Sequence, residues 1–308
     1  NSELYIEKCL NSILKQQFEN FEVILIDDGS SDNSAKIIKS FKDHRIRYYY
    51  QKNLGPASAR NNGAQRALGK YIIFVDSDDY LSDNALNDLA EAILKYDADM
   101  VVYNHIKFNG EKYEPFRYSV DYGRVYNKVE FVNRILDLSV KGYIADKVFK
   151  ASIWHGEKIR FTEQKYCEDW FPVLKYATMC ERIVFLEKPV YYYRQHEGSL
   201  IHKSNANVVC QYSKAVKDIV EYLRAQSYDD NKILTFQMRT SAEIFHELFK
   251  ICGRNAYSEY EKGNYGKFDF KIIRIIASDI PLKTKLSLLA WKTKTYTYLK
   301  LFYRTEEG

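Results

Sequence analysis

Hydrophobic positions in the first hundred residues follow two alternating periods. In residues 2–17 apolar side chains recur every three or four positions, which predicts an amphipathic helix. The segment 21–32 begins as a continuous apolar run that stops at acids and a Gly turn, and 71–75 is a second such run, as is typical of buried parallel strands. The intervening patterns predict helices over 33–41, 56–68 and 82–96 and strands over 45–51 and 99–104.

This alternation predicts an α/β fold with an open, mostly parallel, Rossmann-type sheet and flanking helices, in which ligands bind beyond the carboxyl ends of the strands. Residues 105–200 are less regular, and after about 205 the pattern becomes helical. We therefore expect two regions, 1–204 and 205–308. The later elements predicted are helices over 128–138, 168–176, 207–226 and 231–252, a last helical pair from 270 onward, and strands over 182–187 and 190–193.

Composition narrows the class of protein. Hydrophobic residues at 46% and charged residues at 28% exclude a disordered or collagenous chain, and no apolar run reaches the roughly 18 residues that a membrane-spanning helix needs. Five cysteines without C-x-x-C spacing indicate neither a zinc site nor a disulfide framework, so a reducing cytoplasm is the expected location. The many aromatic residues, 27 Tyr and 17 Phe, suit either walls around a polyhydroxylated ligand or ordinary core packing.

Two acidic clusters follow the buried strands. Asp27 and Asp28 end the first, and Asp76, Asp78 and Asp79 form a D-x-D-D group directly after the second. Carboxylates that converge on one crevice repel each other unless a cation offsets their charge, so Mg²⁺ or Mn²⁺ shared with a diphosphate is the economical explanation. The alternative is that such acids only cap the next helix, which applies most readily to Asp27.

The usual nucleotide motifs are absent from the sequence. Five residues separate Gly63 from Gly69 where a P-loop has four, and Tyr71 stands where Ser or Thr would bind the metal. No G-x-G-x-x-G follows a strand. Any bound phosphates must therefore be held by a metal and by basic side chains.

Three segments together resemble glycosyltransferase family 2 with the GT-A fold: IDDGSSD at 26–32, GPASARNNGAQRALGKYIIFVDSDDYL at 55–81 and CEDW at 167–170. The resemblance covers roughly residues 1–200. It implies transfer of a sugar from a nucleotide diphosphate donor with inversion at the anomeric carbon. Family members usually begin with a buried strand ending in a P-V-Y-N-like motif, whereas this sequence begins at Asn1, so we expect that first strand to be missing from it.

The resemblance implies roles for the residues that hold the donor. Asp28 would hydrogen-bond the base, most often uracil, while Asp27 shapes that pocket. Arg60 and Asn61 would line the nucleotide side. For the D-x-D-D group, Asp78 is the expected metal contact, with Asp76 and Asp79 contacting ribose, metal or donor sugar.

The resemblance also implies a catalytic pair and a diphosphate contact. Asp169 would be the base, with Glu168 beside it to orient the acceptor or the base; the alternative is a first-turn acid favoured by the dipole of the predicted helix. In the YYYRQHEGS segment, Arg194 or His196 would reach the diphosphate, although a lone histidine beside a strand is equally often structural. Lys147 is predicted either to approach phosphate or to be solvated.

The end of the chain carries a separate signal. Between residues 271 and 304 there are eight basic residues and one acid, Asp279. With leucines at helical spacing, this pattern predicts a basic amphipathic helix that lies on an anionic membrane, packs against the catalytic domain, or contacts another subunit. Nucleic acid is not expected as a partner, because no binding motif accompanies the charge. The bases are Lys271, Arg274, Lys283, Lys285, Lys292, Lys294, Lys300 and Arg304.

Together these patterns predict a cytoplasmic, metal-dependent inverting glycosyltransferase, or one held peripherally at the inner face of the cell membrane. The donor is expected to be a UDP-sugar, and the acceptor a hydroxyl of a glycan, glycolipid or glycoprotein, as in the synthesis of a bacterial surface glycan or a glycoprotein sugar chain. The alternatives are a catalytically silent carbohydrate-binding or scaffold protein and a sugar nucleotidyltransferase.

Overall fold

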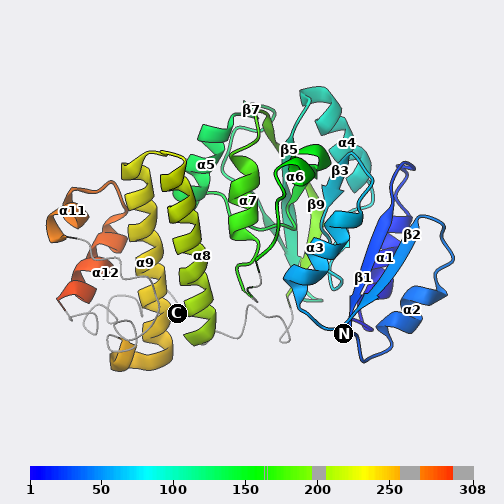
Figure 1. The fold of residues 1–308 in the computed structure, drawn as a ribbon, viewed down its shortest axis with the longest axis horizontal. Coiled ribbons are helices and arrows are strands. Elements are labelled where there is room, and N and C mark those ends of the chain that lie inside the picture. The colour runs from blue at the N-terminus through cyan, green and yellow to red at the C-terminus, as the bar shows by residue number, and fades with distance from the viewer. Residues whose placement is uncertain (163, 165, 196–205, 257–270, 294–308) are drawn as a thin grey trace. The chain divides into compact units, whose positions relative to one another are not determined.

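The computed structural model describes residues 1–162, 164, 166–195, 206–256 and 271–293 (Figure 1). The chain divides into two compact units. One comprises Asn1–Ile135 with Ser139–Glu197, and the other comprises Leu136–Leu138 with Gly198–Gly308. The boundary expected near residue 204 lies outside the described residues.

A two-stranded parallel sheet begins the first unit. β1 (Val23–Asp28) pairs with β2 (Ile46–Gln51) along its whole length, and α3 (Pro56–Arg66) contacts β1. α1 (Ile6–Leu14) and α2 (Ser34–Ser40) belong to the same layer. These elements lie where the alternating pattern predicts them. The core that joins them contains Ile6, Leu10, Val23 and Ile38.

The second sheet of this unit has seven strands of mixed direction. Of its pairings, β5 with β9 is parallel and the others are antiparallel. The predicted parallel character thus lies in β1 with β2 and in β5 with β9, while short connections such as 109–112 allow only antiparallel neighbours. The strand order is β3 (Tyr71–Ile73), β8 (Lys147–Lys150), β5 (Met100–Phe108), β9 (Ile183–Arg194) and β4 (Tyr80–Leu81), with β6 (Tyr113–Phe116) on β5 and β7 (Val125–Tyr126) on β9.

Helices cover this sheet and bury its apolar residues. α4 (Ala85–Tyr96) contributes Leu89 to the core that contains Tyr103 and Val184. An aromatic group fills another part of the unit, with ring centroids 5.3 Å apart for Phe74 and Trp154. Many of the aromatic residues therefore pack the core. The other helices are α5 (Lys128–Leu136), α6 (Ala151–Gly156) and α7 (Trp170–Ala177).

The second unit is helical in the residues that are described. α8 (Ala206–Ala225) and α9 (Asp230–Cys252) lie side by side, and the short connection between them makes them antiparallel (Figure 1). Asp229 caps α9 by accepting hydrogen bonds from the amides of Asn231 and Lys232. A 3-10 turn (Gly253–Asn255) follows α9, and α11 (Ile272–Ala277) and α12 (Leu282–Lys292) complete the described part. The predicted α/β class with a helical C-terminal region is confirmed.

Candidate active site

The acids at the end of β1 are saturated by hydrogen bonds from their own unit. Asp27 is buried and accepts hydrogen bonds from the Ser30 amide, at 2.8 Å, and the Tyr48 hydroxyl, at 2.7 Å. Burial opposes ionisation, but these hydrogen bonds outweigh it and lower the pKa of Asp27 below its ordinary value. Gly29 has φ +72°, so this turn requires a residue that tolerates the left-handed region.

Asp28 fixes the segment that leads into α3. Its Oδ1 accepts from the Gln51 amide group and the Leu54 backbone, and its Oδ2 accepts from the Gly55 backbone, each at 2.8 Å. The carboxylate of Asp28 thus positions the backbone of the segment that leads into α3. Contact with a base stays a prediction.

The acids after β3 are arranged differently. The carboxylate of Asp76 is 37% exposed and accepts a 2.8 Å hydrogen bond from Arg60. Asp79 is buried, with its carboxylate engaged by the Tyr191 hydroxyl and the Arg194 amide, both at 2.7 Å. Burial, and next the charge of Asp76, raises the pKa of Asp79 to about 8. Asp79 therefore faces inward, toward β9, whereas Asp76 reaches solvent.

Arg194 braces this acidic turn. Its Nε donates to the carbonyl oxygen of Asp78 at 2.9 Å, and its guanidinium lies 4.5 Å from the ring centroids of both Tyr5 and Phe108. A guanidinium held between two rings keeps a fixed orientation, which suits a group that must face a diphosphate. The other residue predicted for that role, His196, lies outside the described residues.

Arg60 joins the two acidic motifs that the sequence separates by about ninety positions. One guanidinium nitrogen donates to Asp76 and another donates to Glu168 Oε1, at 2.5 Å. Burial would lower the pKa of Arg60, but the charges of Asp76 and Glu168 raise it above its ordinary value, so the side chain stays a cation. The D-x-D-D group and the E-D pair therefore belong to one site.

Glu168 and Asp169 are neighbours in the sequence with opposite environments. Glu168 forms an ion pair with Arg60. Burial and the charge of Glu168 raise the pKa of Asp169 to about 7, although Arg60 and a 3.2 Å hydrogen bond from the Ile144 amide act in the other direction. A carboxylate with this environment is a better proton acceptor near neutral pH than an ordinary aspartate.

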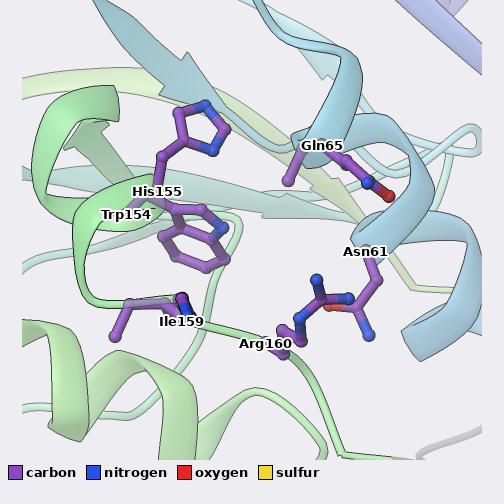
Figure 2. Close-up of a pocket in the computed structure, with 8 residues that line it drawn as sticks. Asn61, Gln65, Trp154, His155, Ile159 and Arg160 are labelled. Carbon is purple, nitrogen blue, oxygen red and sulfur yellow. The ribbon is translucent and has the colours of Figure 1, made fainter.

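Asn61, which is predicted to line the nucleotide side, also holds the backbone of another segment, and its contact with a nucleotide stays a prediction. Its amide nitrogen donates to the Phe161 carbonyl at 3.0 Å, and its oxygen accepts from the Phe161 amide at 2.8 Å. Asn61 thus clamps the segment that follows α6. Figure 2 shows it beside Gln65, Trp154, His155 and Arg160 in the wall of a small open pocket. The acids of the candidate site are not among the residues that line this pocket.

The acids after β3 could bind a divalent cation through a small number of protein ligands. Among the described residues, no group of three or more His, Cys, Asp or Glu side chains is placed to hold a metal ion. The partly exposed Asp76 and its neighbour Asp78 nevertheless add charge that raises the pKa of both Asp79 and the Cys9 thiol. Carboxylates that supply only one or two ligands match Mg²⁺ or Mn²⁺, which take other ligands from water and phosphate.

The sequence model of the family described as "Glycosyl transferase family 2" matches residues 1–147. Residues 1–147 belong to glycosyltransferase family 2. Glycosyltransferase GlyA of Streptococcus pneumoniae is 35% identical to the chain over 210 residues, which are 65% of this chain and 30% of GlyA. The poly(ribitol-phosphate) β-N-acetylglucosaminyltransferase TarS of Staphylococcus aureus is 29% identical over 267 residues, which are 84% of this chain and 44% of TarS. The matches thus span less than half of either relative.

Solved structures place this family 2 domain in the GT-A fold. The crystal structure of S. aureus TarS 1-349 in complex with UDP-GlcNAc has a TM-score of 0.66, 22% identity, and coverage of 99% of this chain and 89% of that one. The mannosyltransferase PcManGT from Pyrobaculum calidifontis, in complex with GDP-Man and Mn²⁺, has a TM-score of 0.50 and 16% identity, with coverage of 96% and 84%. The predicted family and fold are therefore confirmed.

The family 2 domain also contains a buried cation that the sequence left ambiguous. Lys147 has no exposed side-chain surface; its ammonium donates to the carbonyls of Lys141 and Tyr143 and to Asp146. Lys147 is thus neither solvated nor available to phosphate, because every contact holds the loop 141–147. That loop supplies the Ile144 amide to Asp169, so Lys147 positions the predicted base indirectly. In the sequence, the only sign of the ion pair between Lys147 and Asp146 is that the two residues are neighbours in ADKVF.

Among the residues that the structure describes, none of the helices is long and apolar enough to cross a membrane.

Proposed function

We propose that this chain is a metal-dependent, inverting glycosyltransferase that moves a sugar from a UDP-sugar to a hydroxyl group of a glycan, glycolipid or glycoprotein. The observation that carries the proposal is the chain of contacts from Asp76 through Arg60 to Glu168, with Asp169 beside it. These contacts bring acids that we propose to bind the donor close to a carboxylate with a raised pKa. The UDP-GlcNAc complex of TarS supports the choice of donor class.

Asp169 would remove the proton from the acceptor hydroxyl. The acceptor oxygen then forms a bond to the anomeric carbon, and the bond from that carbon to the diphosphate oxygen breaks, so UDP leaves with the electron pair. Attack from the face opposite the leaving group inverts the anomeric centre. Glu168, ion-paired with Arg60, lies next to Asp169, and its charge contributes to the raised pKa of the base.

The donor side would use the remaining acids and the braced arginine. Asp76 and Asp78 would hold Mg²⁺ or Mn²⁺, which when bound neutralises charge on the departing diphosphate. Arg194 would add a cation at the same edge, and Asp28 would order the segment that covers the nucleotide. All five cysteines are free thiols, which supports our proposal that the protein works in the reducing cytoplasm.

Calorimetry with a panel of UDP-sugars, in Mn²⁺, Mg²⁺ or EDTA, tests the donor side of this proposal. One UDP-sugar should bind with a metal and lose most of its affinity in EDTA. Asp78→Ala should weaken this binding by at least about tenfold, because the metal loses a charged ligand. The matched control is Asp83→Ala, which removes an exposed acid a few residues away. The absence of binding by any nucleotide sugar with either metal would overturn the proposal and favour a scaffold protein.

A further inference from the structure

A short helix in the second unit exposes most of its apolar residues. α11 contains four isoleucines, of which Ile275 is buried against Met238 and Leu288. Ile272, Ile273 and Ile276 are 47%, 72% and 58% exposed. Helices on the surface of a globular protein normally direct polar side chains to solvent. The exposed side of α11 is therefore not explained by packing among the residues of this unit that the structure describes.

The adjoining helix continues this pattern. Leu282 and Leu286, one helical turn apart on α12, are 71% and 44% exposed. The ammonium of Lys285 donates to the Ile276 carbonyl at 2.9 Å and so ties α12 to the last turn of α11. Figure 1 shows the two helices next to each other. We call the five exposed side chains the aliphatic surface: Ile272, Ile273, Ile276, Leu282 and Leu286.

Basic residues are interleaved with the aliphatic surface. Lys271 and Arg274 are exposed on α11, and Lys283 is exposed on α12. Asp279 is the one acid between residues 271 and 304. The same stretch of chain thus offers solvent both large aliphatic groups and a dense positive charge.

We propose that the aliphatic surface docks on a membrane that contains anionic lipids. Isoleucine and leucine side chains can enter the boundary between head groups and acyl chains, while the interleaved cations remain at the level of the lipid phosphates. Both the aliphatic side chains and the cations therefore meet a layer of the bilayer that suits them. The attachment is peripheral and is separate from the proposed sugar transfer.

Other occupants fit this surface less well. A second copy docked by the same surface would bring Lys271, Arg274 and Lys283 toward their own counterparts, and like charges repel in a self-complementary contact. Nucleic acid would use the cations, but it would leave the three isoleucines of α11 in water. Anionic lipid alone uses both kinds of side chain.

Co-sedimentation of the full chain with vesicles tests the proposal. The chain should sediment with phosphatidylcholine vesicles that contain about a third phosphatidylglycerol, remain in solution with phosphatidylcholine alone, and dissociate as salt is raised. Replacing three isoleucines together, by Ile272→Ser, Ile273→Ser and Ile276→Ser, should lower the partition coefficient at least about tenfold. Lys271→Gln with Arg274→Gln should also lower it, by a smaller factor that shrinks at high salt.

The matched control replaces two equally exposed leucines of the first unit. Leu68 and Leu94 are 82% and 83% exposed, and Leu68→Ser with Leu94→Ser should leave vesicle binding unchanged. Circular dichroism verifies that each variant is folded. Equal sedimentation with both kinds of vesicle, full binding by the isoleucine variant, or equal loss in the leucine control would overturn the proposal. So would a dimer, seen by light scattering, that the isoleucine variant dissociates without any vesicle binding.

Discussion

The acids after β1 and the acids after β3 look alike in the sequence, since both follow apolar segments. Their carboxylates nevertheless have opposite environments, and Arg60 joins the second group to Glu168, next to Asp169. Asp27 and Asp28 accept five hydrogen bonds from neighbouring groups, and the pKa of Asp27 is lowered. Asp79 is buried and Asp169 is half-buried, each close to another carboxylate, and the pKa of each is raised. The first group holds the fold locally. The second brings several carboxylates close together, which is where ligand and proton chemistry can occur.

Replacing Asp169 should produce the largest effect on activity. Asp169→Asn removes the proton acceptor without changing the size of the side chain, so kcat should fall by roughly 10²- to 10⁴-fold while the dissociation constant of the donor stays the same. Steady-state kinetics and calorimetry measure the two quantities. Asp83→Asn is the control. Wild-type turnover in Asp169→Asn would show that the contrast between the two acidic groups has no catalytic meaning.

The pH dependence of kcat should also distinguish Asp169 from the acids after β1. Because the pKa of Asp169 is raised to about 7, kcat should increase about tenfold per pH unit below that value and level off above it. The free energy of unfolding should change in the opposite direction, because the folded state favours the protonated form of Asp169. The stability that Asp169 contributes is full below about pH 3.8 and is lost as the pH rises through about 7. The free energy of unfolding of Asp169→Asn should lack this decline. A flat kcat between pH 5.5 and 8 would contradict the assignment.

The loop 141–147, beside Asp169, should tolerate an added side chain at Gly142 poorly. A Cβ added at Gly142 would lie 2.7 Å from Trp170 Cγ, so Gly142→Ala must displace either the loop or the residue next to the base. We expect a loss of about 1–3 kcal/mol in stability and a lower kcat. Gly156→Ala is the control, because nothing lies within 4 Å of its added Cβ at the end of α6. Equal denaturation midpoints for both variants would show that the loop adapts.

The smallest effect should come from the saturated group. Tyr48→Phe removes the 2.7 Å hydrogen bond to Asp27, which should cost about 0.5–1.5 kcal/mol in the free energy of unfolding and leave kcat nearly unchanged. Urea denaturation and kinetics at pH 8 measure the two. A large fall in kcat without a loss of stability would place Asp27 in the chemistry instead.

The elements with strong local periodicity were predictable from the sequence. β1, α4, α8 and α9 lie close to the ranges expected, because a continuous apolar run or a helical repeat determines each of them locally. β6, β7 and β8 were not expected, since their short segments become strands only by pairing with β5, β9 and β3. The mixed strand direction of the second sheet follows from those pairings. No pattern within a single segment could predict it.

The candidate site was predictable in its residue types but not in its connections. The acids could be found by their positions after apolar runs and by the family resemblance. That Arg60 reaches Glu168, or that Asn61 holds the Phe161 backbone, depends on contacts between residues 108 and 100 positions apart. The buried state of Lys147 depends likewise on the carbonyls that surround it.

Because Lys147 is enclosed, the chemical reactivity of its amine reports how often the loop 141–147 opens. A water-soluble acylating reagent can reach the amine only after the carbonyls of Lys141 and Tyr143 release it, whereas an exposed lysine such as Lys112 reacts at once. The ratio of the two modification rates, followed by mass spectrometry, therefore reports the opening equilibrium of the segment beside Asp169. A tightly held acceptor would slow the modification of Lys147 alone.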